Sequence, residues 1–145
     1  VTKVKRPKSF CSLKPSGMSS IQKMEEILEA LESDIPSITG TIVASGDGFV
    51  VTETLNGKGK RAEEIAAMVA TTTSVSERMS STLSAGAVEE TSIRGDERSI
   101  FLFRASKKGI LAVIARSEAN VGMIHLRARE AAQAIGKRLQ MSSTT

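Results

Sequence analysis

Three short segments joined by tight connections constrain the fold of this chain most. Residues 88–94, 99–105 and 110–115 have the composition of β-strands. The connections Gly95-Asp96 and Lys107-Lys108-Gly109 are too short for a crossover, so neighbouring strands are expected to be antiparallel. Every residue from 110 to 115 is apolar, which predicts a strand in the middle of a sheet that is covered on both faces.

Two further strands and three helices complete the predicted order. Residues 38–45 and 49–54 are strand-like and flank Gly46-Asp47-Gly48, a strong hairpin signal because Gly accepts a positive φ. A first helix is predicted from Ser19 to just before Pro36. Two others are predicted over about residues 61–83 and 119–139. Apolar residues recur at helical spacing in the first and last of these helices, namely Ile21, Met24, Ile27, Leu28 and Leu31, and Val121, Ile124, Ala128, Ala131, Ile135 and Leu139.

The order α-β-β-α-β-β-β-α predicts the fold class α/β (α+β), with one five-stranded antiparallel sheet and helices on both of its faces. A chain of 145 residues has room for one ordinary domain, which we assign to residues 18–141. Residues 1–17 mix Lys, Pro, Ser and Gly without periodicity, and are predicted to be a disordered basic tail or an extension.

The positive charge of the chain belongs to this tail. The whole chain has a net charge of +4, but residues 1–17 contain five basic residues and no acidic one, leaving 15 basic against 16 acidic residues in the rest. A nucleic-acid site would need a basic stripe on the folded domain itself. No nucleic-acid partner is therefore predicted.

The sequence also favours a cytoplasmic protein without a membrane partner. No apolar run is longer than that of residues 110–115, which is far too short to span a bilayer, and no secretory signal pattern is visible. The single cysteine, Cys11, rules out an internal disulfide. It has no His or Cys neighbours with which to bind zinc.

The central helix over residues 61–83 is the segment that most favours a partner. Seven of its positions form one continuous stripe that is expected to face the core of the domain itself, namely Ala62, Ile65, Val69, Thr72, Ser76, Met79 and Leu83. Outside this stripe, residues 65–76 contain no charged side chain. Met68 and Val75 lie a heptad apart there, among small residues.

A helix without a charged face is buried on more than one side, and one sheet covers only one side. Small residues also let two helix backbones approach closely, so we predict self-association through this helix. The alternative to self-association is that the second side of this helix is a polar surface of Ser and Thr side chains exposed to solvent. The residues predicted at the dimer interface are Val69, Thr72, Thr73, Ser76 and Met79.

No catalytic residue, metal ligand or cofactor site is predicted. His125 is the only histidine, and it has no obvious carboxylate partner in the sequence. Without further histidines, the serines lack a general base that would activate them as nucleophiles. The segment Asn56-Gly57-Lys58-Gly59-Lys60 lacks the spacing of a phosphate-binding P-loop. These absences favour a binding protein over an enzyme.

The order of elements and several local sequences resemble the roadblock / dynein light chain family. The resemblance covers residues 20–139 and is carried by Ile35-Pro36, Gly40-Thr41-Ile42-Val43-Ala44, Asp47-Gly48-Phe49-Val50, Ile110-Leu111-Ala112-Val113-Ile114 and Ala119-Asn120-Val121-Gly122-Met123-Ile124. The chain departs from the family mainly in residues 1–17. The resemblance implies a roadblock/profilin-like fold and a homodimer in which the central helices lie side by side and the third strands pair across the two-fold axis.

The resemblance also implies a non-catalytic function, as a regulator or scaffold of small Ras-like GTPases, of bacterial or archaeal type, or as an adaptor subunit of a larger complex. The residues expected to contact such a partner lie off the inward stripe, and are Met68, Thr71, Val75 and Arg78. A lone helical Arg is more often solvated or ion-paired than a catalytic finger. The alternative function is that of a small-molecule-sensing domain. The low aromatic content of the chain argues against it, because ligand pockets are usually lined by aromatic side chains.

Overall fold

The structure is a computed structural model that describes residues 19–55 and 59–143. The predicted tail, residues 1–17, lies outside the described residues. The elements follow the predicted order, and are α2 (Ser20–Asp34), β1 (Ile38–Ser45), β2 (Val50–Glu53), α3 (Gly59–Thr82), β3 (Glu90–Arg94), β4 (Arg98–Ser106), β5 (Gly109–Arg116) and α4 (Val121–Ser143). The fold class predicted from the sequence is confirmed.

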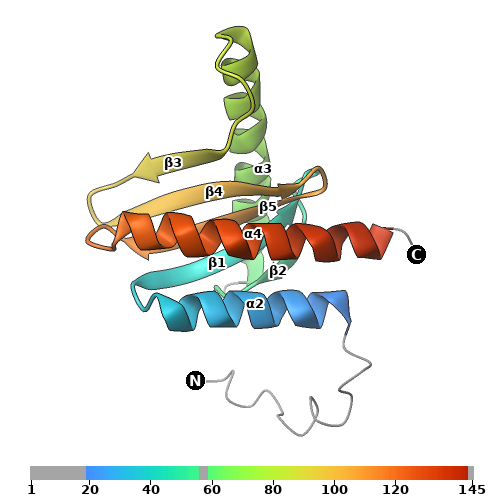
Figure 1. The fold of residues 1–145 in the computed structure, drawn as a ribbon, viewed down its shortest axis with the longest axis vertical. Coiled ribbons are helices and arrows are strands. Elements are labelled where there is room, and N and C mark those ends of the chain that lie inside the picture. The colour runs from blue at the N-terminus through green and yellow to red at the C-terminus, as the bar shows by residue number, and fades with distance from the viewer. Residues whose placement is uncertain (1–18, 56–58, 144–145) are drawn as a thin grey trace, which may run out of the picture.

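The five strands form one antiparallel sheet in the order β2-β1-β5-β4-β3. Strand β5 lies in the centre, as its continuous apolar sequence predicts. Helices α2 and α4 lie side by side on one face, and α3 crosses the other face at a steep angle to the strands (Figure 1). The sheet therefore separates two apolar clusters, one beneath α2 and α4 and a smaller one beneath α3.

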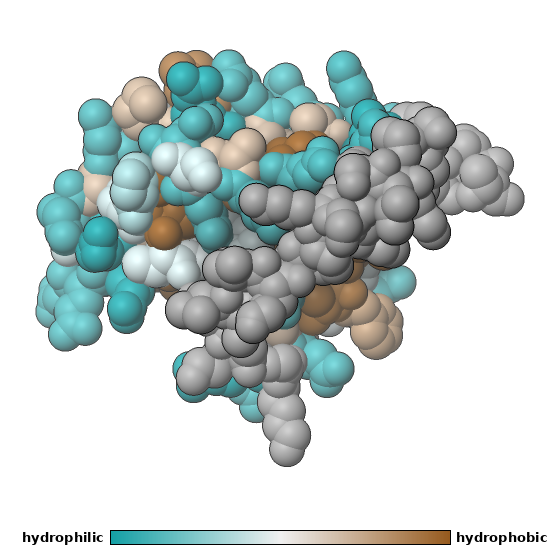
Figure 2. Space-filling model, turned by 90° about the horizontal axis from the view of Figure 1, so that it is seen from below, coloured by the Kyte–Doolittle hydropathy of each residue, from teal (hydrophilic) through white to brown (hydrophobic). Residues whose placement is uncertain are grey.

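Helix α2 begins at a capping box. The Ser19 side chain accepts a hydrogen bond from the Gln22 backbone N–H, and the Gln22 side chain accepts one from the Ser19 N–H. The apolar face of α2 buries Met24, Leu28 and Leu31. The surface seen from the α2 side of the molecule is mostly hydrophilic where it is coloured (Figure 2).

Helix α4 packs on the same sheet face as α2, through the side of the helix that was predicted to face inward. Four of its six predicted inward residues are buried, namely Ile124, Ala128, Ala131 and Ile135. Val121 and Leu139 are partly buried against the same cluster. Gly136 lets α4 lie directly on β4, because a Cβ at this position would stand 1.9 Å from the backbone oxygen of Ala105.

Helix α3 differs from its prediction. Its buried residues are Ala62, Ala66, Val69 and Thr73, rather than the predicted seven-residue stripe. Met79 and Leu83 were expected to face the core and are exposed. The reason is the steep crossing of α3, whose C-terminal part extends past the edge of the sheet (Figure 1). Most contacts of α3 with the sheet are made to β1, β2 and β5.

Candidate functional site

The exposed sides of α3 form the candidate site. Four large apolar side chains on or next to this helix are solvent-exposed, with exposed fractions of 59% for Met68, 49% for Val75, 57% for Met79 and 70% for Leu83. Residues 65–76 between them carry no charge. Single exposed apolar residues are ordinary, but several of them along one helix, two of them within or beside an uncharged stretch, indicate a contact surface.

One flank of α3 contains most of the residues predicted at a dimer interface. Thr72 and Ser76 are half-buried, and Met79 is exposed beside them at the next helical position. Ile93 on the edge strand β3 faces the same side of the sheet, because it pairs with Ile100, which packs on the cluster beneath α3. Ile93 is exposed, although no sequence pattern predicted it at an interface.

Val69 and Thr73 do not belong to this flank. Both are buried against the sheet of their own domain, with exposed fractions of 6% and 5%. They lie in line with Ala62 and Ala66, which makes them part of the underside of α3. Their assignment to a dimer interface is therefore corrected, since side chains that pack on the domain's own sheet are not available to a second molecule.

The predicted partner-binding residues form a second strip. Met68, Thr71, Val75 and Arg78 are all exposed and follow a 3-4-3 spacing, which places them along one side of α3. The Thr71 hydroxyl donates to the Ala67 carbonyl oxygen over 2.9 Å. Burial of Thr71 in an interface would therefore leave its hydroxyl donor satisfied. Within the described part of the chain, no ion pair involves Arg78.

An ion pair ties Glu77, in the C-terminal half of α3, to strand β4. Arg104 on β4 donates from Nε and Nη2 to Glu77 Oε2, at 3.0 and 2.7 Å. Both side chains are about one-third exposed, so the pair acts in a partly screened environment. It nevertheless fixes the direction in which the exposed strips of α3 point.

His125 has a carboxylate neighbour that the sequence did not predict. Its Nε2 lies 2.9 Å from Glu90 Oε2, without the alignment of a hydrogen bond. The ring meets Phe101 and Phe103 edge-on. The pairing of β3 with β4 places Glu90 on the α4 side of the sheet, beside His125. The contact ties β3 to α4, and the Ser92 hydroxyl on β3 donates to the same Glu90 oxygen over 3.4 Å.

Comparison with known proteins agrees with this architecture. A profile of the Roadblock/LC7 domain matches residues 23–115. This chain belongs to the Roadblock/LC7 family. An uncharacterized protein of Methanocaldococcus jannaschii is 31% identical over 98 residues, which cover 68% of this chain and 84% of that protein. The family resemblance inferred from the sequence is therefore confirmed.

Solved structures share the fold of this Roadblock/LC7 domain. The gliding protein MglB of Thermus thermophilus superposes with a TM-score of 0.75 at 16% identity, covering 84% of this chain and 92% of that one. A Roadblock/LC7 domain of Streptomyces avermitilis gives a TM-score of 0.69 at 20% identity, covering 82% and 96%. At such identities the likeness establishes the fold alone.

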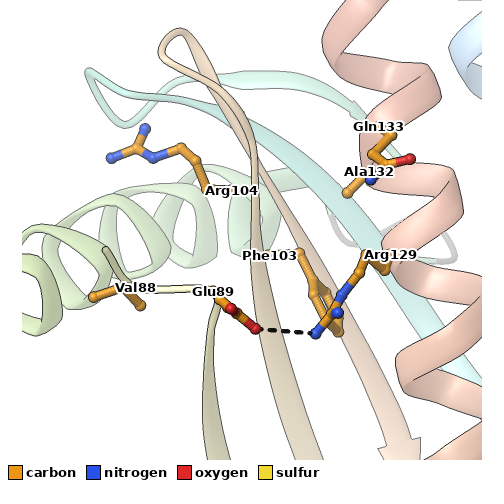
Figure 3. Close-up of a pocket in the computed structure, with 7 residues that line it drawn as sticks. All are labelled: Val88, Glu89, Phe103, Arg104, Arg129, Ala132 and Gln133. Atoms are coloured by element: carbon orange, nitrogen blue, oxygen red, sulfur yellow. Dashed lines mark ion pairs between the residues drawn. The ribbon is translucent and has the colours of Figure 1, made fainter. Parts of the chain in front are cut away.

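A cavity of about 310 Å³ lies between β4, α4 and the segment before β3 (Figure 3). Its two arginines already have carboxylate neighbours, because Arg129 lies 3.6 Å from Glu89 and Arg104 binds Glu77. The cavity therefore offers a ligand little uncompensated charge. Among the described residues, no cluster of His, Cys, Asp or Glu could hold a metal ion, and no helix is long and apolar enough to cross a membrane.

Proposed function

We propose that this Roadblock/LC7 domain is a homodimer formed through the flank of α3 that carries Thr72, Ser76 and Met79. Leu83 and Ile93 extend this flank with exposed apolar side chains. Half-buried small residues allow two α3 helices to approach closely, while the larger side chains at the rim gain burial. One related structure is described as MglB in a tetrameric arrangement, which supports self-association as a property of this fold.

We further propose that the dimer is a non-catalytic regulator or scaffold of a small Ras-like GTPase. The observation that carries this proposal is the uncharged, exposed strip on α3 that contains Met68, Thr71 and Val75. Such a strip suits docking of a protein better than solvation. Regulation would follow from binding to the mobile switch segments of the GTPase and biasing their conformation.

We expect Met68→Glu and Val75→Glu each to weaken GTPase binding by at least about 100-fold, because a carboxylate would be desolvated at the centre of the contact. Arg78→Ala should weaken binding only about fivefold, as is typical of an exposed charge. The measurement is titration calorimetry with purified Ras-like GTPases of the source organism, each loaded with GDP or a non-hydrolysable GTP analogue.

The matched control is Leu126→Glu, which places the same charge at an exposed apolar position on α4, on the opposite face of the sheet. It should bind the GTPase as the unmodified chain does. Binding is interpreted only for variants that retain the mass of the dimer. Full affinity in both α3 variants would place the binding site elsewhere. Absence of binding to every GTPase by the unmodified chain would favour the adaptor function.

A further inference from the structure

The C-terminal half of α3 receives little support from the sheet. Of the residues that follow Thr73 in this helix, from 74 to 82, none is buried. Val75 and Arg78 of the proposed GTPase-binding strip lie in this half. A helix segment with few packing contacts opens easily and can take several orientations. Binding through Val75 and Arg78 therefore requires another contact that fixes this half of the helix.

Arg104 supplies such a contact from the sheet. Its Nε and Nη2 both donate to Glu77 Oε2, over 3.0 and 2.7 Å, and its Nη1 donates to the Ser106 carbonyl oxygen over 3.4 Å. These hydrogen bonds hold the planar guanidinium between the helix and the end of β4. Among the described residues, no other ion pair joins α3 to the sheet.

An irregularity in β4 accompanies the position of Arg104. The register between β4 and β5 shifts between Arg104 and Ser106, so the strand is bulged at this point. Bulges bend a strand and redirect its side chains. Arg104 pairs with Ile110, which packs in the cluster beneath α3, and it therefore lies on the α3 face of the sheet. The sheet thus presents the guanidinium beside the half of α3 that it does not bury.

The ion pair and the proposed dimer contact lie on different sides of α3. Glu77 and Met79 are two residues apart, which separates them by about 160° around an α-helix. A second copy seated on the dimer flank would support α3 from one side, and Arg104 supports it from another. The strip of Val75 and Arg78 lies between these two supports, on the exposed side of α3 that is turned away from the sheet.

We propose that Arg104 and Glu77 are positioning residues for GTPase binding, because their ion pair sets the orientation of the part of α3 that carries Val75 and Arg78. This inference rests on the proposed function and adds to it two residues that need not touch the GTPase. Fixing this part of the helix before binding lowers the entropy that is lost when the partner docks. Loss of the pair should weaken binding more than it weakens folding, because a partly exposed ion pair contributes little to stability.

The test exchanges the charges at the two positions and measures binding of the GDP-loaded and analogue-loaded GTPases by titration calorimetry. Glu77→Arg and Arg104→Glu each place like charges opposite one another, and each should lower the affinity about tenfold by reducing the population of the competent orientation. The double variant Glu77→Arg, Arg104→Glu restores an ion pair and should recover the affinity to within about threefold. The matched control Glu130→Arg makes the same charge change in an ion pair of α4, with Arg127, and should bind normally.

The directions of the two single effects separate positioning from a direct effect of charge on the partner. The two variants change the net charge in opposite directions, so a direct effect would raise the affinity in one and lower it in the other. Orientation by the ion pair predicts a loss in both. Amide hydrogen exchange of residues 75–82 is a second readout that needs no partner. It should accelerate in both single variants and return to the original rate in the double variant.

Each outcome separates this inference from the function on which it rests. If both single variants bind with full affinity while Val75→Glu does not, the positioning role is wrong and the α3 site stands. Opposite effects of the two single variants would also overturn it. Should like charges prevent folding, Glu77→Gln removes the charge at nearly constant size and should still lower the affinity about threefold. If the unmodified chain binds none of the GTPases, both proposals fail.

Discussion

Replacement of Gly136 by alanine is expected to lower the free energy of unfolding by about 3 kcal/mol. The added methyl group would stand 1.9 Å from the backbone oxygen of Ala105 and 2.9 Å from its carbonyl carbon. Backbone atoms of the sheet cannot move aside as a flexible side chain can, so α4 would have to lift away from β4. The helix propensity of alanine recovers only about 1 kcal/mol of this loss. Denaturant unfolding followed by circular dichroism measures the change.

Gly122→Ala is the matched control, because it makes the same substitution in the first turn of the same helix. A Cβ at Gly122 meets only the Asn120 side-chain oxygen at 3.4 Å, and the residue is exposed. This variant should be as stable as the unmodified chain or slightly more stable. Equal stability of the two alanine variants would contradict the close packing of α4 on β4.

The second large effect is expected for Thr72→Glu, which should convert the dimer into a folded monomer. Thr72 is half-buried on the proposed dimer flank, and the two-fold symmetry of a helix pair would bring two carboxylates into one desolvated contact. The cost is about 4 kcal/mol, which would raise a micromolar dissociation constant about 1000-fold. In the monomer the longer side chain reaches solvent, so folding should persist. Light scattering coupled to size exclusion gives the mass.

Ala30→Glu is the control for this variant, since Ala30 is exposed on α2 and on the other face of the sheet. It should leave the mass unchanged. Val69→Glu is unsuitable for this purpose, because Val69 packs on the domain's own sheet and its replacement would damage the fold itself. A Thr72→Glu protein that remains fully dimeric would exclude this flank of α3 as the interface.

The sequence predicted the fold well because its signals were local and consistent. The apolar run of residues 110–115 indicated the central strand, and Asp47-Gly48 indicated the hairpin. The strand order itself followed only in part, because short turns fix which strands are antiparallel neighbours but not how the β1–β2 hairpin joins the other three strands. That connection was not predicted, and the structure shows that β1 pairs with β5.

The candidate site was less accessible to sequence reasoning. Helical periodicity indicated which residues of α3 share a side, but it could not show where the sheet stops covering the helix. Met79 was therefore predicted to face the core, and Thr73 to face a second molecule. The contact between His125 and Glu90 depends on strand pairing between distant segments, which leaves no local signal.

Sedimentation equilibrium of the unmodified chain at micromolar concentration tests the central claim most directly. The exposed apolar side chains of α3 are proposed to be covered by a second copy, so the protein should sediment with twice the chain mass of 15.4 kDa. The mass should fall toward that of one chain only on strong dilution, in accord with a reversible association. A protein that sediments as a single chain throughout the micromolar range would contradict self-association through α3.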